Sequence, residues 1–358
     1  MALRIVDFGT ASALFSQAAW YGFARHMKEG DAPVLCLVES AEPYLCIGFS
    51  QNADRELDRE FCAEKGLAVI RRRLGGGAVY IDERQLIFHF VFPRRTVPPG
   101  PLNLYPYFIA PVLSTYRDFG IAALTRPPSD IHVAGRKIGG TAAALWREAV
   151  VLGGSFLFDF DGALFARSLK VPSLQFREKL ERALEEHMTS MRRLLREPPS
   201  RASVKARFSH HAARSFGLEA FADDPRPQEM AAIREEEARL SDRSSLDRPG
   251  RKLVPNGVKI AAGIYLTEGS SKAEGGLLHV RLLERDGKIA DLDLSCDPEG
   301  AAARGLALLA SRLKGNALDK PILLAAIAEA MSEIGIEPST PSAEEIAAAL
   351  AAARHRGP

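Results

Sequence analysis

The chain has 358 residues, of which 46% are hydrophobic and 26% charged, enough for two hydrophobic cores. Its 47 basic and 45 acidic residues give a net charge of +2, so no overall field favours nucleic acid or a membrane surface as partner. The sequence contains neither an apolar run of roughly 18 residues nor a secretory signal pattern, and this predicts a soluble, cytoplasmic protein.

The four cysteines are far apart and follow no metal-ligand or CxxC spacing. We therefore predict buried packing residues and neither a disulfide framework nor a zinc site. The cysteines are Cys36, Cys46, Cys62 and Cys296.

The first elements mix helical and strand patterns. Residues 11–29 are rich in helix formers, and the apolar segments "APVLCLVE" and "PYLCIGF" predict a hairpin or two neighbouring strands. "RELDREFCAEKG" has helical spacing and a stop at Gly66, and "LAVIRRR" then predicts another strand.

The central segment "AVYIDERQLIFHFVFP" alternates with the period of a strand. His89 shares a face with Ile87 and Val91, and we interpret it as a buried histidine with satisfied polar atoms. "SDIHVAGRKIGGTAAAL" predicts a strand pair turning at Ala134 and Gly135, and "AVVLGGSFLFDF" adds a strand. Hairpins with helices between them indicate an α+β fold with a largely antiparallel mixed sheet flanked by helices.

The second half is organised differently. Residues 174–250 are helical, charged and punctuated by proline, and "GGLLHVRLLERDGKIADLDLS" then predicts a hairpin around Asp286 and Gly287. Helices follow, with Pro298 and Pro321 suited to first-turn positions, and the last helix has a capping box from Ser342 to Glu345.

These patterns predict two domains joined by a linker. Residues 1–240 form the larger domain, expected to be catalytic, with a helical extension. Residues 241–256 form a linker, and 257–358 form a small α/β accessory domain.

The segment "RRRLGGGAVYIDER" places arginines before Gly75, Gly76 and Gly77. Glycines at a strand end allow close approach to the backbone, and arginines suit a carboxylate or phosphate. Neither a P-loop nor a Rossmann turn fits, and a bulged surface hairpin is the alternative. Lys137 follows a tight turn beside another glycine pair, where it would be either solvated or directed into a glycine-lined hollow.

These segments together resemble the lipoate-protein ligase family, within the biotin and lipoate ligase superfamily. "RRRLGGGAVYIDE" is close to its RRxSGGGAVYHD, and "SDIHVAGRKIGGTA" is close to its NDIxxxGRKISGxA. "VESAEPYLCIGFSQN", "GGSFLFDFD" and "LKVPSLQFREK" match its IGxxQN, HGTLLxxxD and LKVPxxKFxxK segments in the same order. The hairpin and helices after residue 270 resemble the family's C-terminal accessory domain.

The resemblance implies a two-step reaction with ATP and Mg²⁺. Lipoate or octanoate is activated as an acyl-AMP, and the acyl group then passes to a lysine of a lipoyl-domain or specialised lipoate-binding carrier protein. By the same resemblance, Lys137 is the cation that bridges the acyl carbonyl and the α-phosphate. Trp20 is a candidate for the apolar slot that takes the acyl tail.

The substrate and adenylate site that the resemblance implies has several further members. Arg72 would contact the acyl group or adenylate, Asp130 would lie in the nucleotide site, and the glycines would pass against the acyl-adenylate. The implied binding residues are Arg72, Gly75, Gly76, Gly77, Ala78, Asp130 and Gly140. No metal site made by protein groups alone is implied, because Mg²⁺ arrives with ATP.

The chain departs from the family pattern at several positions. Leu74 replaces the serine before the glycines, and Gly153 replaces the histidine before the GT pair. The other departures are Ile81, Arg84, Gln85, Ser129 and the Cys296-Asp297-Pro298 end of the accessory hairpin. Because Lys137, Arg72 and the three glycines are retained, we predict an active, specialised ligase with an altered acyl pocket or carrier preference.

Three alternatives stay open. An ATP-independent octanoyl or lipoyl transferase would need an activated cysteine, and "GRKIGGTAAALWREAVVLGGS" contains none. A non-catalytic paralogue would only bind lipoate or a carrier, and biotin ligation would need a basic glycine motif that is absent. His210 and His211 could suggest a metal, but adjacent helical residues diverge, so we predict a surface or packing role.

Overall fold

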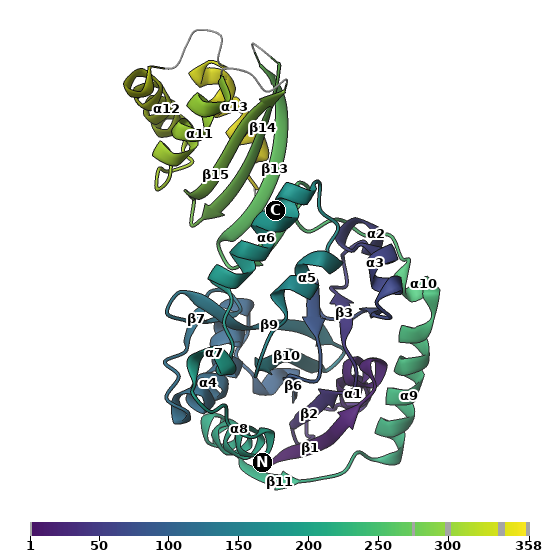
Figure 1. The fold of residues 1–358 in the computed structure, drawn as a ribbon. Helices are drawn as coiled ribbons and strands as arrows, with labels where there is room; N and C mark the ends of the chain where they lie inside the picture. The colour runs from purple at the N-terminus through teal and green to yellow at the C-terminus, as the bar shows by residue number, and fades with distance from the viewer. Residues whose placement is uncertain (1, 274–275, 298–301, 336–340, 356–358) are drawn as a thin grey trace. The chain divides into compact units, whose positions relative to one another are not determined.

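The computed structural model describes residues 2–273, 276–297, 302–335 and 341–355, and the chain forms two compact units (Figure 1). The first unit comprises Met1–Lys170 and Leu184–Lys252, and the second comprises Val171–Ala183 and Leu253–Pro358. The sequence had placed residues 171–183 with the first domain. They belong to the second unit because Lys179, 2% exposed, pairs there with Asp291 and Asp293 at 2.6 and 2.9 Å.

An eight-stranded mixed sheet forms the centre of the first unit and confirms the α+β prediction. Strand β1 runs parallel to both of its neighbours, and the remaining strands pair antiparallel. In spatial order the strands are β11 (Glu219–Ala222), β1 (Ala2–Ala11), β2 (Val34–Ser40), β6 (Gln85–Pro93), β10 (Ala149–Leu157), β9 (Arg136–Trp146), β8 (Asp130–Val133) and β7 (Leu124–Arg126).

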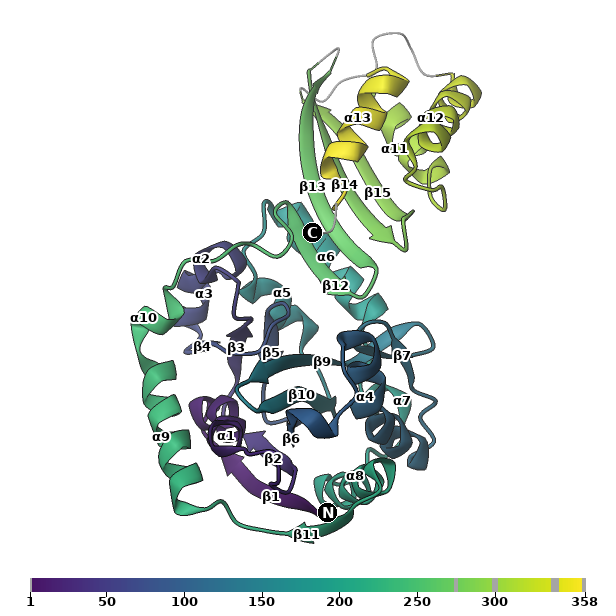
Figure 2. The same ribbon diagram turned by 180° about the vertical axis from the view of Figure 1, so that it is seen from behind.

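Strand β6 divides its side chains between two faces, as its alternation predicts, and different helices bury the two faces. Leu86, Phe88, Phe90 and Phe92 pack against α4 (Pro101–Asp118) and α8 (Arg201–Phe216). Val91 faces the other way and packs with α1 (Ala13–His26), against which α9 (Pro227–Ser241) lies (Figure 2). The sheet is therefore covered on both sides.

A second, three-stranded sheet supports the glycine segment. Its order is β4 (Ala68–Arg71), β3 (Tyr44–Ile47) and β5 (Val79–Ile81). The prediction that β2 and β3 are neighbouring strands is wrong, because β1 and β6 occupy both edges of β2. The single predicted helix before Gly66 is also wrong: it is split into α2 (Ala53–Glu56) and α3 (Arg59–Glu64), since Leu57 is extended and bridges to Leu169.

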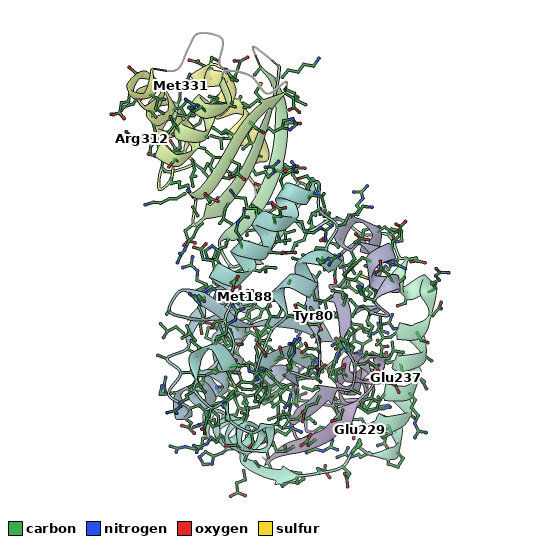
Figure 3. The ribbon with its side chains drawn as sticks, in the orientation of Figure 1. Tyr80, Met188, Glu229, Glu237, Arg312 and Met331 are labelled. Carbon is green, nitrogen blue, oxygen red and sulfur yellow. The ribbon has the colours of Figure 1, made fainter. Side chains whose placement is uncertain are left out.

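The first unit also contains several short helices, and a salt bridge joins β1 to α9. Arg4 on β1 binds Glu229 on α9 at 2.8 and 3.0 Å, and Figure 3 shows Glu229 and Glu237 along that helix. The short helices are η1 (Arg94–Thr96), α5 (Gly162–Ser168), α7 (Met191–Leu194) and α10 (Arg243–Leu246).

The second unit is an antiparallel sheet of four sequential strands, and the three C-terminal helices cover one of its faces. The predicted hairpin turn is confirmed, because Asp286 and Gly287 have φ of 52° and 77°. Pro321 lies in the first turn of its helix and the Ser342 capping box is present, whereas Pro298 lies outside the described residues. The elements are β12 (Gly257–Ala261), β13 (Ile264–Ala273), β14 (Gly276–Arg285), β15 (Lys288–Asp297), α11 (Ala302–Arg312), α12 (Lys320–Ile334), α13 (Ala343–Ala353) and the first part of α6 (Leu174–His187).

Within the part of the chain that the structure describes, no helix combines the length and apolar character needed to cross a membrane.

Candidate active site

Lys137, Asp130 and Gly140 meet at one point of the β8–β9 hairpin. Lys137 Nζ lies 3.0 Å from Asp130 Oδ1, and the two side chains are 22% and 8% exposed. A Cβ placed on Gly140 would lie 3.1 Å from Lys137 Nζ and 3.3 Å from Asp130 Oδ1. The glycine therefore leaves the space that this ion pair needs, and a partly exposed ammonium remains beside it.

The hairpin turn orients Lys137 toward Asp130. Ala134 and Gly135, with φ of 48° and 79°, make the predicted two-residue turn, so that β9 returns antiparallel along β8. The Lys137 carbonyl also accepts a hydrogen bond from Thr189 N at 2.8 Å. The backbone of Lys137 is thus fixed on both sides.

His132 belongs to this group, although the sequence analysis did not single it out. Its Nε2 lies 3.9 Å from Asp130 Oδ2, and this buried nitrogen has no hydrogen-bond partner among the described residues. The signal was present in the sequence: positions 130 and 132 of one strand point to the same face.

Arg72 binds the backbone of the glycine segment. Its Nη2 donates to Gly75 O and Gly77 O at 2.7 and 2.8 Å, and its Nη1 donates to Cys46 O at 3.0 Å. Gly76 has φ of 91°, which favours glycine. Arg72 therefore sets the shape of this loop, in which Gly76 is exposed and Gly75, Gly77 and Ala78 are half-buried.

Arg71 fastens a distant segment beside the same loop. Its buried guanidinium donates to backbone carbonyls of Phe49, Gln51, Ser245, Leu246 and Arg248. Gly250 packs directly on Gln51, where a Cβ would lie 2.3 Å from Gln51 O. Residues 245–251, within the predicted linker, are consequently held against the first unit.

Arg73 lies between two aromatic rings. Its guanidinium carbon is 4.7 Å from the Tyr21 ring centroid and 4.5 Å from that of Trp146, and its nitrogens bind Glu236 at 2.7 and 2.8 Å. Although burial raises the pKa of Glu236, hydrogen bonds from Arg239 and Arg73 outweigh it, and the net pKa is lowered. The three adjacent arginines thus contact three different parts of the unit.

The glycine segment and the Lys137 hairpin meet through neighbouring strands. Leu74, which precedes the glycines, packs at Gly153 on β10, and Gly153 is in register with Ala142 on β9. A Cβ on Gly154 would lie 3.1 Å from Gly140 O. The motifs "RKIGGTA" and "GGSFLFDFD" therefore begin on the paired strands β9 and β10, and Leu74 brings the glycine segment next to β10.

The departures at Ile81, Arg84 and Gln85 have structural partners here. Arg84 Nε donates to Asp82 Oδ2 at 2.8 Å, and Ile81 is buried in the core. Gln85 Nε2 donates to Tyr80 O at 2.9 Å, and its Oε1 accepts from Ser155 Oγ at 3.1 Å. These side chains brace the strands that hold the site.

The cysteines and His211 lie outside this group of residues. All four cysteines are buried, and burial raises the pKa of each thiol, that of Cys62 to about 11. No group of three histidine, cysteine or acidic side chains suited to a metal occurs among the described residues. His211 Nε2 lies 2.8 Å from Asp118 Oδ2, which joins α8 to α4. The buried Trp20 lies with Leu74 in one apolar cluster.

Comparison with solved structures shows the class of fold. A bipartite lipoate protein ligase from Thermoplasma acidophilum, reported with its E2 lipoyl domain, superposes with a TM-score of 0.65 at 22% identity, covering 70% of this chain and 99% of that one. A lipoate-protein ligase A bound with ATP gives a TM-score of 0.60 at 21% identity, covering 69% and 99%. The fold is that of the lipoate-protein ligases.

The sequence shows the family. Residues 14–213 match the model of the lipoyl protein ligase A/B catalytic domain, and the chain belongs to this family. A curated relative, the octanoyltransferase LipM of Kyrpidia tusciae, is 27% identical over 239 residues, which are 60% of this chain and 87% of the relative. The family therefore includes both ligases and transferases.

Proposed function

We propose that this chain is an ATP-dependent lipoate-protein ligase. It activates lipoate or octanoate as acyl-AMP and transfers the acyl group to a lysine of a lipoyl-carrier protein. The observation that carries the proposal is the pair of Lys137 and Asp130, held 3.0 Å apart beside Gly140. Such a pair supplies a positioned cation where negative charge increases during phosphoryl and acyl transfer.

The first half-reaction places charge on the α-phosphate. A carboxylate oxygen of the acid attacks the α-phosphorus of ATP, and pyrophosphate leaves with the bonding electrons. The Lys137 ammonium stabilises the charge on the phosphate and acyl oxygens, and Asp130 keeps that ammonium in place. The glycines 75–77 let the adenylate lie close to the backbone.

The second half-reaction breaks the mixed anhydride. The neutral amine of the carrier lysine attacks the acyl carbon, and the acyl C–O bond to the phosphate breaks. AMP leaves as the anion, and the nitrogen loses a proton to water as the amide forms. The same Lys137 cation stabilises the tetrahedral oxyanion and the leaving phosphate.

Mg²⁺ is proposed to enter on the phosphates of ATP. The described residues offer no cluster of three metal-ligating side chains, and the Asp130 carboxylate already contacts Lys137. This chain's contribution to charge neutralisation is therefore its own cations.

The first unit is assigned the catalytic role and the second unit an accessory role. The carrier is proposed to be a lipoyl domain, supported by the Thermoplasma acidophilum ligase that was reported with its E2 lipoyl domain, or a specialised lipoate-binding protein. We expect the reaction in the cytoplasm, where ATP is available.

The second candidate is a cysteine-dependent octanoyltransferase, favoured by the similarity to LipM. A thioester mechanism needs a thiolate that substrate can reach. All four thiols are buried and have raised pKa values, so each would have to become exposed before it could react. The burial of the cysteines supports the ligase over this candidate.

The test is the intact mass of a lipoyl domain after incubation with this protein, ATP, Mg²⁺ and lipoate. The proposal predicts a lipoyl mass gain that requires ATP and disappears with Lys137→Ala. A gain from an octanoylated donor without ATP would instead establish the transferase. Lipoate binding without any mass gain would establish a non-catalytic binding protein.

A further inference from the structure

Two departures from the family pattern, Leu74 and Gly153, touch each other and a third residue, His89. Gly153 on β10 and His89 on β6 are directly opposite in register. A Cβ on Gly153 would lie 2.6 Å from His89 Cδ2 and 2.9 Å from Leu74 Cδ1. No side chain fits at position 153 unless His89 or Leu74 moves, so the three residues form an interdependent set.

His89 is an unusual member of this apolar region. It is 2% exposed, its ring centroid lies 6.2 Å from that of Trp20, and burial lowers its pKa to about 3, so the imidazole is neutral near pH 7. Its Nδ1 and the Nε1 of Trp20 have no hydrogen-bond partner within the described residues. The prediction that His89 has satisfied polar atoms is therefore wrong for Nδ1.

An unpartnered buried nitrogen is costly, so a bound substrate is a candidate partner for it. Leu74 leads directly into the glycine segment, and it shares the apolar cluster with Trp20. The resemblance implies a histidine at position 153, where this chain has glycine. His89 brings an imidazole to the same place from the neighbouring strand.

We propose that His89 is a specificity-determining residue of the acyl pocket, which provides from β6 the imidazole that the resemblance implies at position 153. Its neutral ring contacts the acid substrate through a hydrogen bond, and Gly153 and Leu74 shape the space around that ring. The inference rests on the proposed function, because it takes this cluster as the acyl pocket.

The experiment measures binding of octanoate and of lipoate to the full chain by calorimetry, without ATP. His89→Phe keeps an aromatic ring, although a somewhat larger one, and removes both nitrogens. We expect its dissociation constant for the acids to rise about tenfold, the value of one hydrogen bond, with the melting temperature changed by only a few degrees. The Michaelis constant for ATP should not change. His210→Phe, an exposed ring on α8, is the matched control.

A double variant tests whether a histidine at position 153 can replace His89. Gly153→His alone should lower the melting temperature and abolish acid binding, because its side chain collides with His89 and Leu74. His89→Ala combined with Gly153→His should restore both to within a few fold of the wild type. Unchanged acid binding by His89→Phe, or a double variant no better than Gly153→His, would overturn the inference.

The acid-binding measurement separates this inference from the ligase proposal. Wild-type protein that binds the acids but makes no acyl-AMP would overturn the ligase and leave the role of His89 standing. Wild-type protein that binds neither acid would overturn the inference itself.

Discussion

The hairpin that carries Lys137 and the strand end that carries Arg71 and Arg72 both place cations beside glycines, yet the cations have different partners. Lys137 meets the Asp130 carboxylate and stays 22% exposed. Arg71 and Arg72 are less than one tenth exposed and donate to backbone carbonyls. The first arrangement leaves charge available to a substrate, whereas the second uses charge to hold the scaffold.

The comparison predicts its largest effect at Lys137. Lys137→Ala should lower the rate of acyl-AMP formation by about 100- to 1,000-fold, because a positioned cation is lost from the transition state. The melting temperature should change little, since the side chain is partly exposed. Single-turnover adenylation with ATP and lipoate measures the rate. Unchanged adenylation would show that Lys137 is only a surface cation.

Arg71 should instead affect stability. Arg71→Ala leaves five carbonyls without their donor and should reduce the free energy of unfolding by about 2–3 kcal/mol. Urea denaturation measures the change, with Arg95→Ala as control, because the Arg95 side chain is 74% exposed. Equal stabilities of the two variants would contradict the scaffold role.

Within the hairpin, activity should depend on Gly140 more than on its neighbour Gly139. Gly140→Ala places a methyl group 3.1 Å from Lys137 Nζ and should shift the ion pair, lowering kcat about 10- to 100-fold with the fold intact. Gly139→Ala is the matched control, since its Cβ has no neighbour closer than Ser155 O at 3.4 Å. Similar activity of the two variants would remove Gly140 from the site.

The smallest effect is expected at the cysteines. Replacing Cys62 with serine should leave ATP-dependent lipoylation unchanged. Because its pKa is raised to about 11, the Cys62 thiol is protonated at pH 8 and should resist alkylation by iodoacetamide in the native protein. Mass spectrometry of native and unfolded protein measures the labelling. Rapid native labelling of any of the four cysteines with loss of activity would favour the transferase.

Much of the fold follows from local patterns in the sequence. The alternation in β6 predicts which side chains share a face of that strand, and the Asp286-Gly287 and Ala134-Gly135 turns predict two hairpins. The meeting of Asp130 with Lys137 follows once that second hairpin is recognised, because Lys137 pairs with His132, and Asp130 is the next residue on the same face of that strand.

Other features could not be predicted, because they depend on contacts between distant residues. Arg71 binds carbonyls that lie 174 to 177 positions away, and a backbone carbonyl leaves no mark in the sequence. The separation of β2 from β3 depends on both edges of β2 being taken by other strands. The lack of a hydrogen-bond partner for His89 Nδ1 depends on which groups the neighbouring strands place around it, and their register is not given by the local sequence.

The most direct test of the central claim is exchange of labelled pyrophosphate into ATP, measured with lipoate and Mg²⁺ but without any carrier protein. The proposed ligase predicts exchange that depends on lipoate and is lost in Lys137→Ala. No exchange by the wild type, together with acyl transfer from an octanoylated carrier in the absence of ATP, would contradict it.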